Sequence, residues 1–211
     1  MTVSDYQHLS KATIARLPQY YRTFKQLQLL RTERVNSQEL GKLTQIPAAT
    51  IRHDFSLFGE LGKSGYGYAV NDMVNFFGRL LGVEQEDKLI LVGVGPLGQA
   101  LLENGFRRNP NLQIVAAFDV DPKVIGRSIN RVKVRAFQPM PTLPEGVHSA
   151  IIAVPSAATE AVVKQLEAMG VDTILSFAPQ IVNVKPTTTI RYVDLTSEVQ
   201  TLLFTARWRH H

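Results

Sequence analysis

The first third of the chain carries its apolar residues at the spacing of helices. From residue 10 to about residue 31 they recur at steps of three and four, which places them on one face of an amphipathic helix. Ser10 can cap this helix, Asn36 or Ser37 can cap a second, and Pro47 suits the first turn of a third. The pattern predicts four helices, over about residues 10–31, 37–43, 47–58 and 71–81.

A glycine-rich segment, residues 59–68, separates the third predicted helix from the fourth. Its glycines alternate with aromatic residues, a pattern that favours a tight β-hairpin over a helix. Helices followed by a hairpin and a closing helix predict a winged helix-turn-helix domain over residues 1–82. Residues 82–87 are polar and include three acidic side chains, so we interpret them as a linker.

Beyond Lys88, short apolar runs alternate with helical patterns, which indicates βαβ units and a parallel, Rossmann-like sheet over residues 88–193. The predicted strands are Leu89–Val92, Ile114–Phe118, Ala150–Val154, Thr173–Phe177 and Ile190–Val193, and the predicted helices are Leu97–Phe106 and Ala157–Met169. A C-terminal segment, residues 194–211, begins with an apolar helix directly after the last strand. We expect that helix to find its partner on another subunit. The predicted fold class is α/β with an N-terminal winged helix-turn-helix domain.

The positive charge of the chain is concentrated at its start. Residues 1–70 hold nine Lys and Arg against five Asp and Glu, a net charge of +4, and residues 71–211 hold fourteen against thirteen, a net charge of +1. This asymmetry indicates that the first segment meets a polyanion, although a solvated basic surface has the same composition.

Composition also excludes several classes of protein. The chain has no cysteine, so disulfides, thiolate metal sites and a thiol nucleophile are excluded. No apolar run approaches the roughly 18 residues of a membrane span, and the N-terminus carries no apolar signal segment. We therefore expect a cytoplasmic protein that has no membrane partner and no metal site.

A dinucleotide-binding motif lies directly after the first predicted strand. Gly93-Val94-Gly95-Pro96-Leu97-Gly98 matches G-x-G-x-x-G, in which the glycines permit a tight turn, close approach of a pyrophosphate, and helix-on-sheet packing. Asp119 ends the next strand, 21 residues after Gly98, where a carboxylate can accept hydrogen bonds from ribose hydroxyls. The same carboxylate repels a 2′-phosphate, so the pattern favours NAD and NADH over NADP. The alternative is a plain βα turn in which Asp119 caps the next turn.

Two further segments stand at the carboxyl ends of later strands, where ligands of such sheets bind. They are Val154-Pro155 and Phe177-Ala178-Pro179. Both are secondary candidates for the cofactor site, since each can equally be an ordinary strand exit.

The motifs of the chain occur in a characteristic order. They are Arg16-Leu17-Pro18 with Tyr20-Tyr21-Arg22, Thr50–Ser56, Phe58-Gly59, Gly62–Tyr68, Gly93–Gly98, Phe118–Pro122 and Phe177–Pro179. Together, over nearly the whole chain, they resemble the Rex family of redox-sensing transcriptional repressors. The stretch from Thr50 to Tyr68 is the most specific part of this resemblance. Rex proteins commonly have a second cation where this chain has His53.

The DNA-binding residues follow from the third helix and the hairpin. A helix that presents Thr50, Arg52 and His53 on one side, after a short helix and a turn, is what a helix-turn-helix inserts in the major groove. The hairpin, as the wing, brings further side chains to the DNA backbone. The candidate DNA contacts on these elements are Thr50, Arg52, His53, Ser56, Lys63, Ser64 and Tyr66. Arg16, on the first predicted helix, is a further candidate that can contact either phosphate or the partner domain. Each of these residues, taken alone, is as compatible with an ordinary solvated surface as with a DNA contact.

The resemblance to Rex implies a homodimer on double-stranded palindromic DNA, with the C-terminal helix swapped between the partner's two domains. Such a dimer places its two recognition helices about 34–36 Å apart, one turn of DNA. NADH would favour an arrangement that no longer fits both half-sites. Arg22 and Asp194 are the candidates for an ion pair that exists in only one state.

Two other functions compete with this interpretation. A small NAD-dependent oxidoreductase would need a substrate domain and a general base, and we expect no catalytic residue in this chain. A non-catalytic nucleotide- or CoA-binding module would leave the N-terminal helices unexplained.

Overall fold

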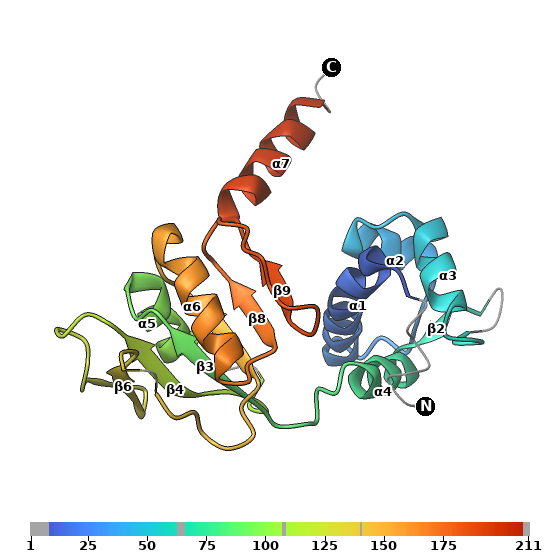
Figure 1. Ribbon diagram of the computed structural model, residues 1–211. Coiled ribbons are helices and arrows are strands. Elements are labelled where there is room, and N and C mark those ends of the chain that lie inside the picture. Colours follow the sequence, from blue (N-terminus) through green and yellow to red (C-terminus); the bar gives the residue numbers. More distant parts are fainter. Residues whose placement is uncertain (1–8, 63–65, 107–108, 140, 209–211) are drawn as a thin grey trace. The chain divides into compact units, whose positions relative to one another are not determined.

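The computed structural model describes residues 9–62, 66–106, 109–139 and 141–208. The chain divides after Gln85 into two compact units, which we treat separately. In the first unit (Figure 1), the four predicted helices are confirmed. The helices are α1 (Lys11–Leu29), α2 (Ser37–Thr44), α3 (Ala48–Ser56) and α4 (Val70–Leu80), and two strands, β1 (Arg34–Val35) and β2 (Tyr68–Ala69), form an antiparallel pair.

Side-chain caps mark the starts of the first two helices. The Ser10 hydroxyl accepts a hydrogen bond from the Thr13 amide at 3.0 Å, and this bond begins α1. Asn36 forms a capping box with Glu39 at the start of α2. Pro47 is the N-cap residue of α3 and makes no side-chain capping bond.

The predicted hairpin over residues 59–68 is wrong in its strand pairing. Tyr68 pairs with Val35 of β1, which precedes α2, and no strand lies in residues 59–62 of the described chain. Gly67, with φ +68°, lies so close to β1 that an added Cβ would be 2.7 Å from the Val35 carbonyl oxygen. The glycine thus permits a close approach to a distant strand, not a two-residue turn. Lys63 and Ser64 lie outside the described residues.

An aromatic cluster forms the core of the first unit. The rings of Tyr20 and Phe24 of α1 lie 5.0 and 6.2 Å from the ring of Phe55 of α3, centroid to centroid. Phe77 of α4 lies 5.4 Å from the same ring. Contacts of this kind contribute about 0.5–1.5 kcal/mol each beyond the area they bury. The core therefore joins α3 to α1 and α4 through Phe55.

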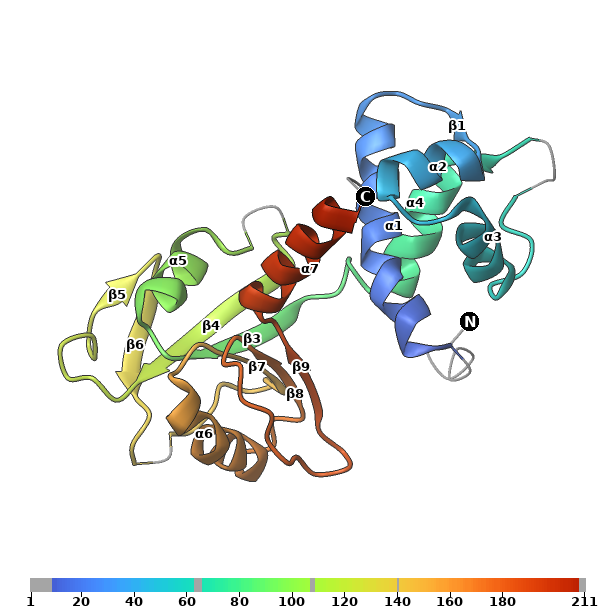
Figure 2. The ribbon, with the colours of Figure 1, turned by 90° about the horizontal axis from the view of Figure 1, so that it is seen from above.

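The second unit contains a seven-stranded sheet in the order β5-β6-β4-β3-β7-β8-β9 (Figures 1 and 2). All neighbouring strands are parallel except β5 and β6. The strands are β3 (Asp87–Val92), β4 (Leu112–Asp119), β5 (Ser128–Ile129), β6 (Val132–Ala136), β7 (Ser149–Ile152), β8 (Thr173–Ser176) and β9 (Thr189–Tyr192). The predicted Rossmann-like sheet is confirmed, and the β5–β6 hairpin is an addition that the hydrophobic pattern did not predict.

Helices cover both faces of this sheet (Figure 2). Ile90 and Val92 of β3 pack in one cluster with residues of α6 (Ser156–Ala168), whereas Leu91 packs with Leu102 of α5 (Pro96–Asn104). Because successive side chains of a strand point to opposite faces, α5 and α6 lie on opposite sides. This arrangement brings the turns that follow β3 and β7 to the carboxyl edge of the sheet.

The C-terminal helix α7 (Leu195–Trp208) has no buried residue. Its exposed apolar side chains are Leu195, Val199, Leu202, Leu203, Phe204 and Trp208, and the rings of Phe204 and Trp208 stack with centroids 6.0 Å apart. An isolated helix of this length is marginal in water. Among the described residues, the apolar face of α7 therefore lacks the packing that normally stabilises such a helix.

Candidate functional site

The glycine-rich turn connects β3 to α5 and is shaped by two of its three glycines. Gly93 has φ +96°, and a Cβ there would lie 2.5 Å from the Ala153 carbonyl oxygen. A Cβ at Gly98 would overlap the Gly93 carbonyl oxygen. The packing of the protein itself therefore requires both residues.

Gly95, the middle glycine, is not required by the packing of the protein. A Cβ built on Gly95 meets no heavy atom within 4 Å. Gly95 is the N-cap residue of α5, no side chain caps this helix, and Pro96 is its first residue. The amides of the first turn therefore remain available to an anion beside an open backbone, an arrangement that fits a pyrophosphate.

Asp119 holds the glycine-rich turn against the end of β4. One carboxylate oxygen, Oδ2, accepts a hydrogen bond from the Val94 amide at 2.6 Å. The other, Oδ1, accepts hydrogen bonds from the amides of Val120 and Asp121 at 2.7 and 2.8 Å. Since a carboxylate offers about four lone-pair positions, one remains for a ribose hydroxyl. The acid that sequence analysis predicted thus joins the two strands that form the site.

A cavity of about 590 Å³ opens at this edge of the sheet. Seven of the predicted cofactor residues line it, namely Gly93, Val94, Gly95, Pro96, Asp119, Val154 and Pro155. Five others do not line it, namely Leu97, Gly98, Phe177, Ala178 and Pro179. Leu97 and Gly98 lie in the first turn of α5, and the other three follow β8, where Ala178 is buried.

Other residues of the cavity were not predicted from the sequence. Phe137 follows β6, a strand that the hydrophobic pattern missed, and Val124 lies in the turn after β4. Gln99 lies four residues after Gly95 on α5, so helical spacing could have identified it. Its side-chain amide donates to the Val94 carbonyl at 3.1 Å. Val92, Val124, Phe137 and Val162 make the lining of the cavity mainly apolar.

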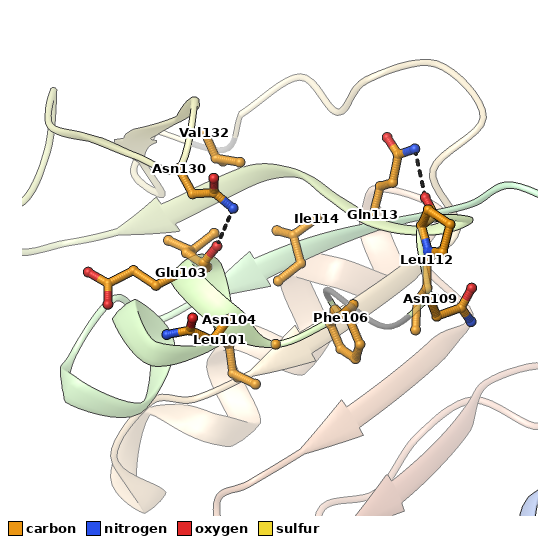
Figure 3. A pocket seen from close by; sticks show the side chains of 13 residues that line it. Leu101, Glu103, Asn104, Phe106, Asn109, Leu112, Gln113, Ile114, Asn130 and Val132 are labelled. Carbon is orange, nitrogen blue, oxygen red and sulfur yellow. Dashed lines mark hydrogen bonds between the residues drawn. The ribbon is translucent and has the colours of Figure 1, made fainter. Parts of the chain in front are cut away.

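A smaller cavity of about 260 Å³ lies at the other end of α5 (Figure 3). Asn104 and Phe106 line it, together with Asn130 of the β5–β6 turn. The Asn130 amide donates to the Leu102 carbonyl at 2.9 Å and so ties that hairpin to α5. The lining of this smaller cavity includes neither the Gly93–Gly98 turn nor Asp119, so the cavity is separate from the candidate cofactor site.

The helix α3 presents most of its polar residues to solvent. Arg52, His53 and Ser56 are exposed and Thr50 is half-buried, whereas Ile51, Asp54 and Phe55 are buried. Arg52 donates to the Ser37 hydroxyl at 3.0 Å, which places its guanidinium beside the start of α2. The exposed face has the amphipathic form that a recognition helix requires.

Arg16, a predicted DNA contact, forms an ion pair with the buried carboxylate of Asp54 on α3. Its Nε and Nη2 atoms lie 2.6 and 2.7 Å from the two carboxylate oxygens. Burial alone would raise the pKa of Asp54, but hydrogen bonds from Arg16 and Tyr20 outweigh it and lower the pKa below its usual value. Burial also contributes most to the raised pKa of the Tyr20 hydroxyl.

In the segment between α3 and α4, which we call the wing, Tyr66 is exposed. An arginine that sequence analysis did not select holds the backbone there. Arg34 of β1 donates to the backbone carbonyls of Tyr66 and Gly67 at 2.8 and 3.0 Å. Its guanidinium carbon lies 5.8 Å from the centre of the Tyr66 ring. A lone arginine in a two-residue strand gives no sequence signal of this role.

The two candidate switch residues lie in different units. Arg22 is exposed on α1. Asp194 caps α7 by accepting hydrogen bonds from the Ser197 hydroxyl at 2.6 Å and the Thr196 amide at 2.9 Å. The Ser197 hydrogen bond contributes most to lowering the pKa of Asp194. The carboxylate of Asp194 therefore stabilises the start of the C-terminal helix.

The part of the chain that the structure describes supports neither a membrane-spanning helix nor a metal site. No helix there is both long and apolar enough to cross a membrane. The same residues contain no group of three or more His, Asp or Glu side chains that could hold a metal ion.

Two domain families match successive parts of the chain. Residues 8–56 match the family described as "Putative DNA-binding protein N-terminus". Residues 84–180 match the family described as "CoA binding domain". The second match begins at residue 84, close to the division of the structure after Gln85, and the first lies within the first unit.

The chain is similar to curated proteins named redox-sensing transcriptional repressor Rex. The protein from Latilactobacillus sakei is 45% identical over 92% of this chain and 95% of its own length. A Rex protein from Geobacillus kaustophilus is 41% identical over 93% of this chain and 92% of its own length.

Solved structures have the same overall fold. The crystal structure of RSP in complex with β-NAD+ and operator DNA is 26% identical, with a TM-score of 0.85 over 96% of this chain and 94% of that one. The structure of RSP with β-NADH is 24% identical with a TM-score of 0.86 and supports the fold alone.

Proposed function

The chain belongs to the Rex family of redox-sensing transcriptional repressors, and from this we propose that it binds operator DNA through its first unit and releases it when NADH binds to its second. One observation carries this proposal. The same chain combines an exposed face on α3, bearing Arg52 and His53, with an open glycine-rich cavity that ends in Asp119.

The glycine-rich turn provides the site for NADH or NAD+. The open backbone at Gly95 and the first turn of α5, with Leu97 and Gly98, would hold the pyrophosphate. The remaining lone pair of Asp119 would accept a ribose hydroxyl, and the negative charge of Asp119 disfavours NADP. The cofactor supplies the redox signal, since its nicotinamide ring is charged when oxidised and neutral when reduced.

The apolar lining of the cavity provides a physical basis for distinguishing the two forms. Burying a charged ring costs free energy that burying a neutral ring does not. Val124, Phe137 and Val154 are among the apolar residues that impose this cost. Val154 and Pro155 border the cavity directly, and Phe177, Ala178 and Pro179 remain secondary candidates for contact with the cofactor.

DNA recognition belongs to α3 and the wing. Arg52, His53 and Ser56 would enter the major groove, with Thr50 at its edge, and Tyr66 would lie against the DNA backbone. The predictions for Lys63 and Ser64 remain predictions. Since the target of such a protein is chromosomal DNA, we propose a cytoplasmic location.

A homodimer would cover the exposed face of α7. The apolar side chains of Leu202, Phe204 and Trp208 need a partner surface, and a second copy that swaps this helix would provide one. Two copies would present two α3 helices to the half-sites of a palindromic duplex. Arg22 and Asp194 remain our candidates for an ion pair that forms in only one state of this dimer.

We propose no catalytic activity, in keeping with relatives that are transcription regulators. The match to the CoA-binding family over residues 84–180 supports a second candidate ligand, coenzyme A. Both ligands contain an adenosine and a pyrophosphate, so they would compete for the same cavity. Their relative affinities would show which of them is the preferred ligand.

The test begins with selection of operator duplexes from a random pool by the protein itself. Binding of the selected duplex is then measured by fluorescence anisotropy while NADH, NAD+ or coenzyme A is added. We expect NADH to release the DNA at concentrations at which NAD+ and coenzyme A do not. Release by coenzyme A alone, or no effect of NADH at saturation, would contradict the proposed function.

A further inference from the structure

The recognition helix α3 contains a buried carboxylate. The Asp54 side chain has no exposed surface, and the Arg16 side chain that pairs with it is 25% exposed. Four hydrogen bonds satisfy the carboxylate: two from Arg16 at 2.6 and 2.7 Å, one from the Tyr20 hydroxyl at 2.6 Å and one from the Thr13 hydroxyl at 3.2 Å. All of the donors come from α1.

The donors lie on one face of α1. Thr13, Arg16 and Tyr20 are spaced three and four residues apart, so they follow one another along a single stripe of the helix. Asp54 lies on the buried side of α3, opposite the exposed residues Arg52 and Ser56. The network therefore holds the back of the helix whose front would contact DNA.

Stability alone does not explain a buried ion pair of this kind. A well-packed apolar replacement of such a pair is often neutral or stabilising, because the desolvation of two charges offsets their attraction. What the polar network adds is direction, because hydrogen bonds of 2.6–2.7 Å fix the rotation of α3 about its axis. A rotation of about 20° would move side-chain tips by about 2 Å, enough to break contacts to base edges.

We propose that Arg16, Tyr20 and Thr13 position the recognition helix through Asp54, so that Arg16 is a positioning residue and not a DNA contact. This inference rests on the proposed function. It gives Arg16 a role different from the one that its positive charge and position predict. It also explains why an acidic side chain lies in a helix that must approach phosphates, since the charge of Asp54 is buried and paired with Arg16.

The main test replaces the network by apolar residues of similar size, in the full-length triple variant R16M/Y20F/D54L. This variant loses one positive and one negative charge, so its net charge is unchanged. We expect its unfolding midpoint to stay within a few degrees of that of the wild type. We expect its affinity for a random-sequence duplex to stay within about twofold. We expect its preference for the operator over that duplex to fall about tenfold or more.

Two results would overturn this inference. An unchanged preference for the operator would reduce the network to a structural role. For the random duplex, log K falls as log salt rises. If this negative slope were smaller in magnitude by about 0.9 per protomer in the triple variant than in the wild type, Arg16 would contact a phosphate. The wild type is measured in parallel, so absence of any operator preference in the wild type would count against the proposed function instead.

A milder pair of variants decides the matter if the triple variant does not fold. Tyr20→Phe removes one of the four hydrogen bonds and no charge, and Tyr21→Phe removes a neighbouring hydroxyl from the same helix. We expect Tyr20→Phe to lower the operator preference by about three- to tenfold and Tyr21→Phe to leave it unchanged. Equal preferences in the two variants would overturn the proposal.

Discussion

The two candidate sites differ in what they are made of. The cofactor site of the second unit is built mainly from backbone, since Gly95 leaves an open strip of main chain and Asp119 is held by three amides. The DNA-binding face of the first unit is built from side chains of α3, oriented by other side chains behind it. A site built from backbone should therefore be most sensitive to added atoms that fill its space. A site built from side chains should be most sensitive to the loss of single side chains.

The substitution Gly95→Val tests the backbone site most severely. A Cβ at this position meets no heavy atom within 4 Å, so we expect the fold to tolerate a small side chain there, and that side chain would occupy the space proposed for the pyrophosphate. We expect NADH affinity to fall by about 100-fold or more, while the unfolding midpoint stays close to that of the wild type. Isothermal titration calorimetry and thermal unfolding measure the two quantities.

Ala100→Val is the matched control for that substitution, because Ala100 is exposed on the same helix α5 and does not line the cavity. Its NADH affinity should equal that of the wild type. Normal NADH binding by Gly95→Val would mean that the pyrophosphate does not lie against this residue.

The prediction for Arg52 tests the side-chain site. Arg52→Ala removes an exposed guanidinium from α3 in both protomers, and a lost base contact costs about 1–3 kcal/mol in each half-site. We expect weaker binding to the operator and relaxed sequence preference, measured by anisotropy on operator and mismatched duplexes. Arg79→Ala, which removes an exposed cation of α4, should change neither. A uniform loss on all duplexes would assign Arg52 to phosphate.

The sequence predicted the backbone site better than the side-chain network, for a physical reason. Gly93–Gly98 and Asp119 act within one βαβ unit, so their spacing alone predicts their geometry. The four helices of the first unit followed likewise from local periodicity.

Interactions between distant residues escaped the prediction. Arg16 and Asp54 are 38 residues apart, and only tertiary structure brings them together. Strand β1 pairs with β2 across two helices, so the hairpin prediction failed there. Phe137 was missed because β6, which lies next to the edge strand β5, alternates apolar and charged residues and lacks the continuous apolar run of the central strands.

The pH dependence of stability should report the contribution of Asp54 to the first unit. The pKa of Asp54 is lowered in the folded state, so its charged form stabilises the first unit above its ordinary pKa of about 3.9 and this contribution is lost as pH falls below that value. Asp54→Asn should cost about 1.5–3 kcal/mol near pH 7, and the difference from the wild type should shrink towards pH 3. Urea unfolding at several pH values measures this difference, and a constant difference would contradict it.

The smallest effect is expected in the β5–β6 hairpin, where backbone conformation again decides the outcome. Asn130 and Arg131 form its two-residue turn, with φ values of +46° and +70°. A left-handed conformation costs a residue with a Cβ about 1–2 kcal/mol, and glycine avoids that cost but loses more entropy on folding. Arg131→Gly should therefore stabilise the second unit by about 0.5–1 kcal/mol.

The control for that substitution removes the same side chain where no strain exists. Arg127 precedes β5 and has no positive φ, so Arg127→Gly has only the entropic cost and should be neutral or slightly destabilising. Thermal unfolding of both variants measures the difference. Because both variants lose one exposed arginine, a rise in the unfolding midpoint confined to Arg131→Gly must come from backbone conformation and not from charge. Equal midpoints in the two variants would mean that the turn stores no strain.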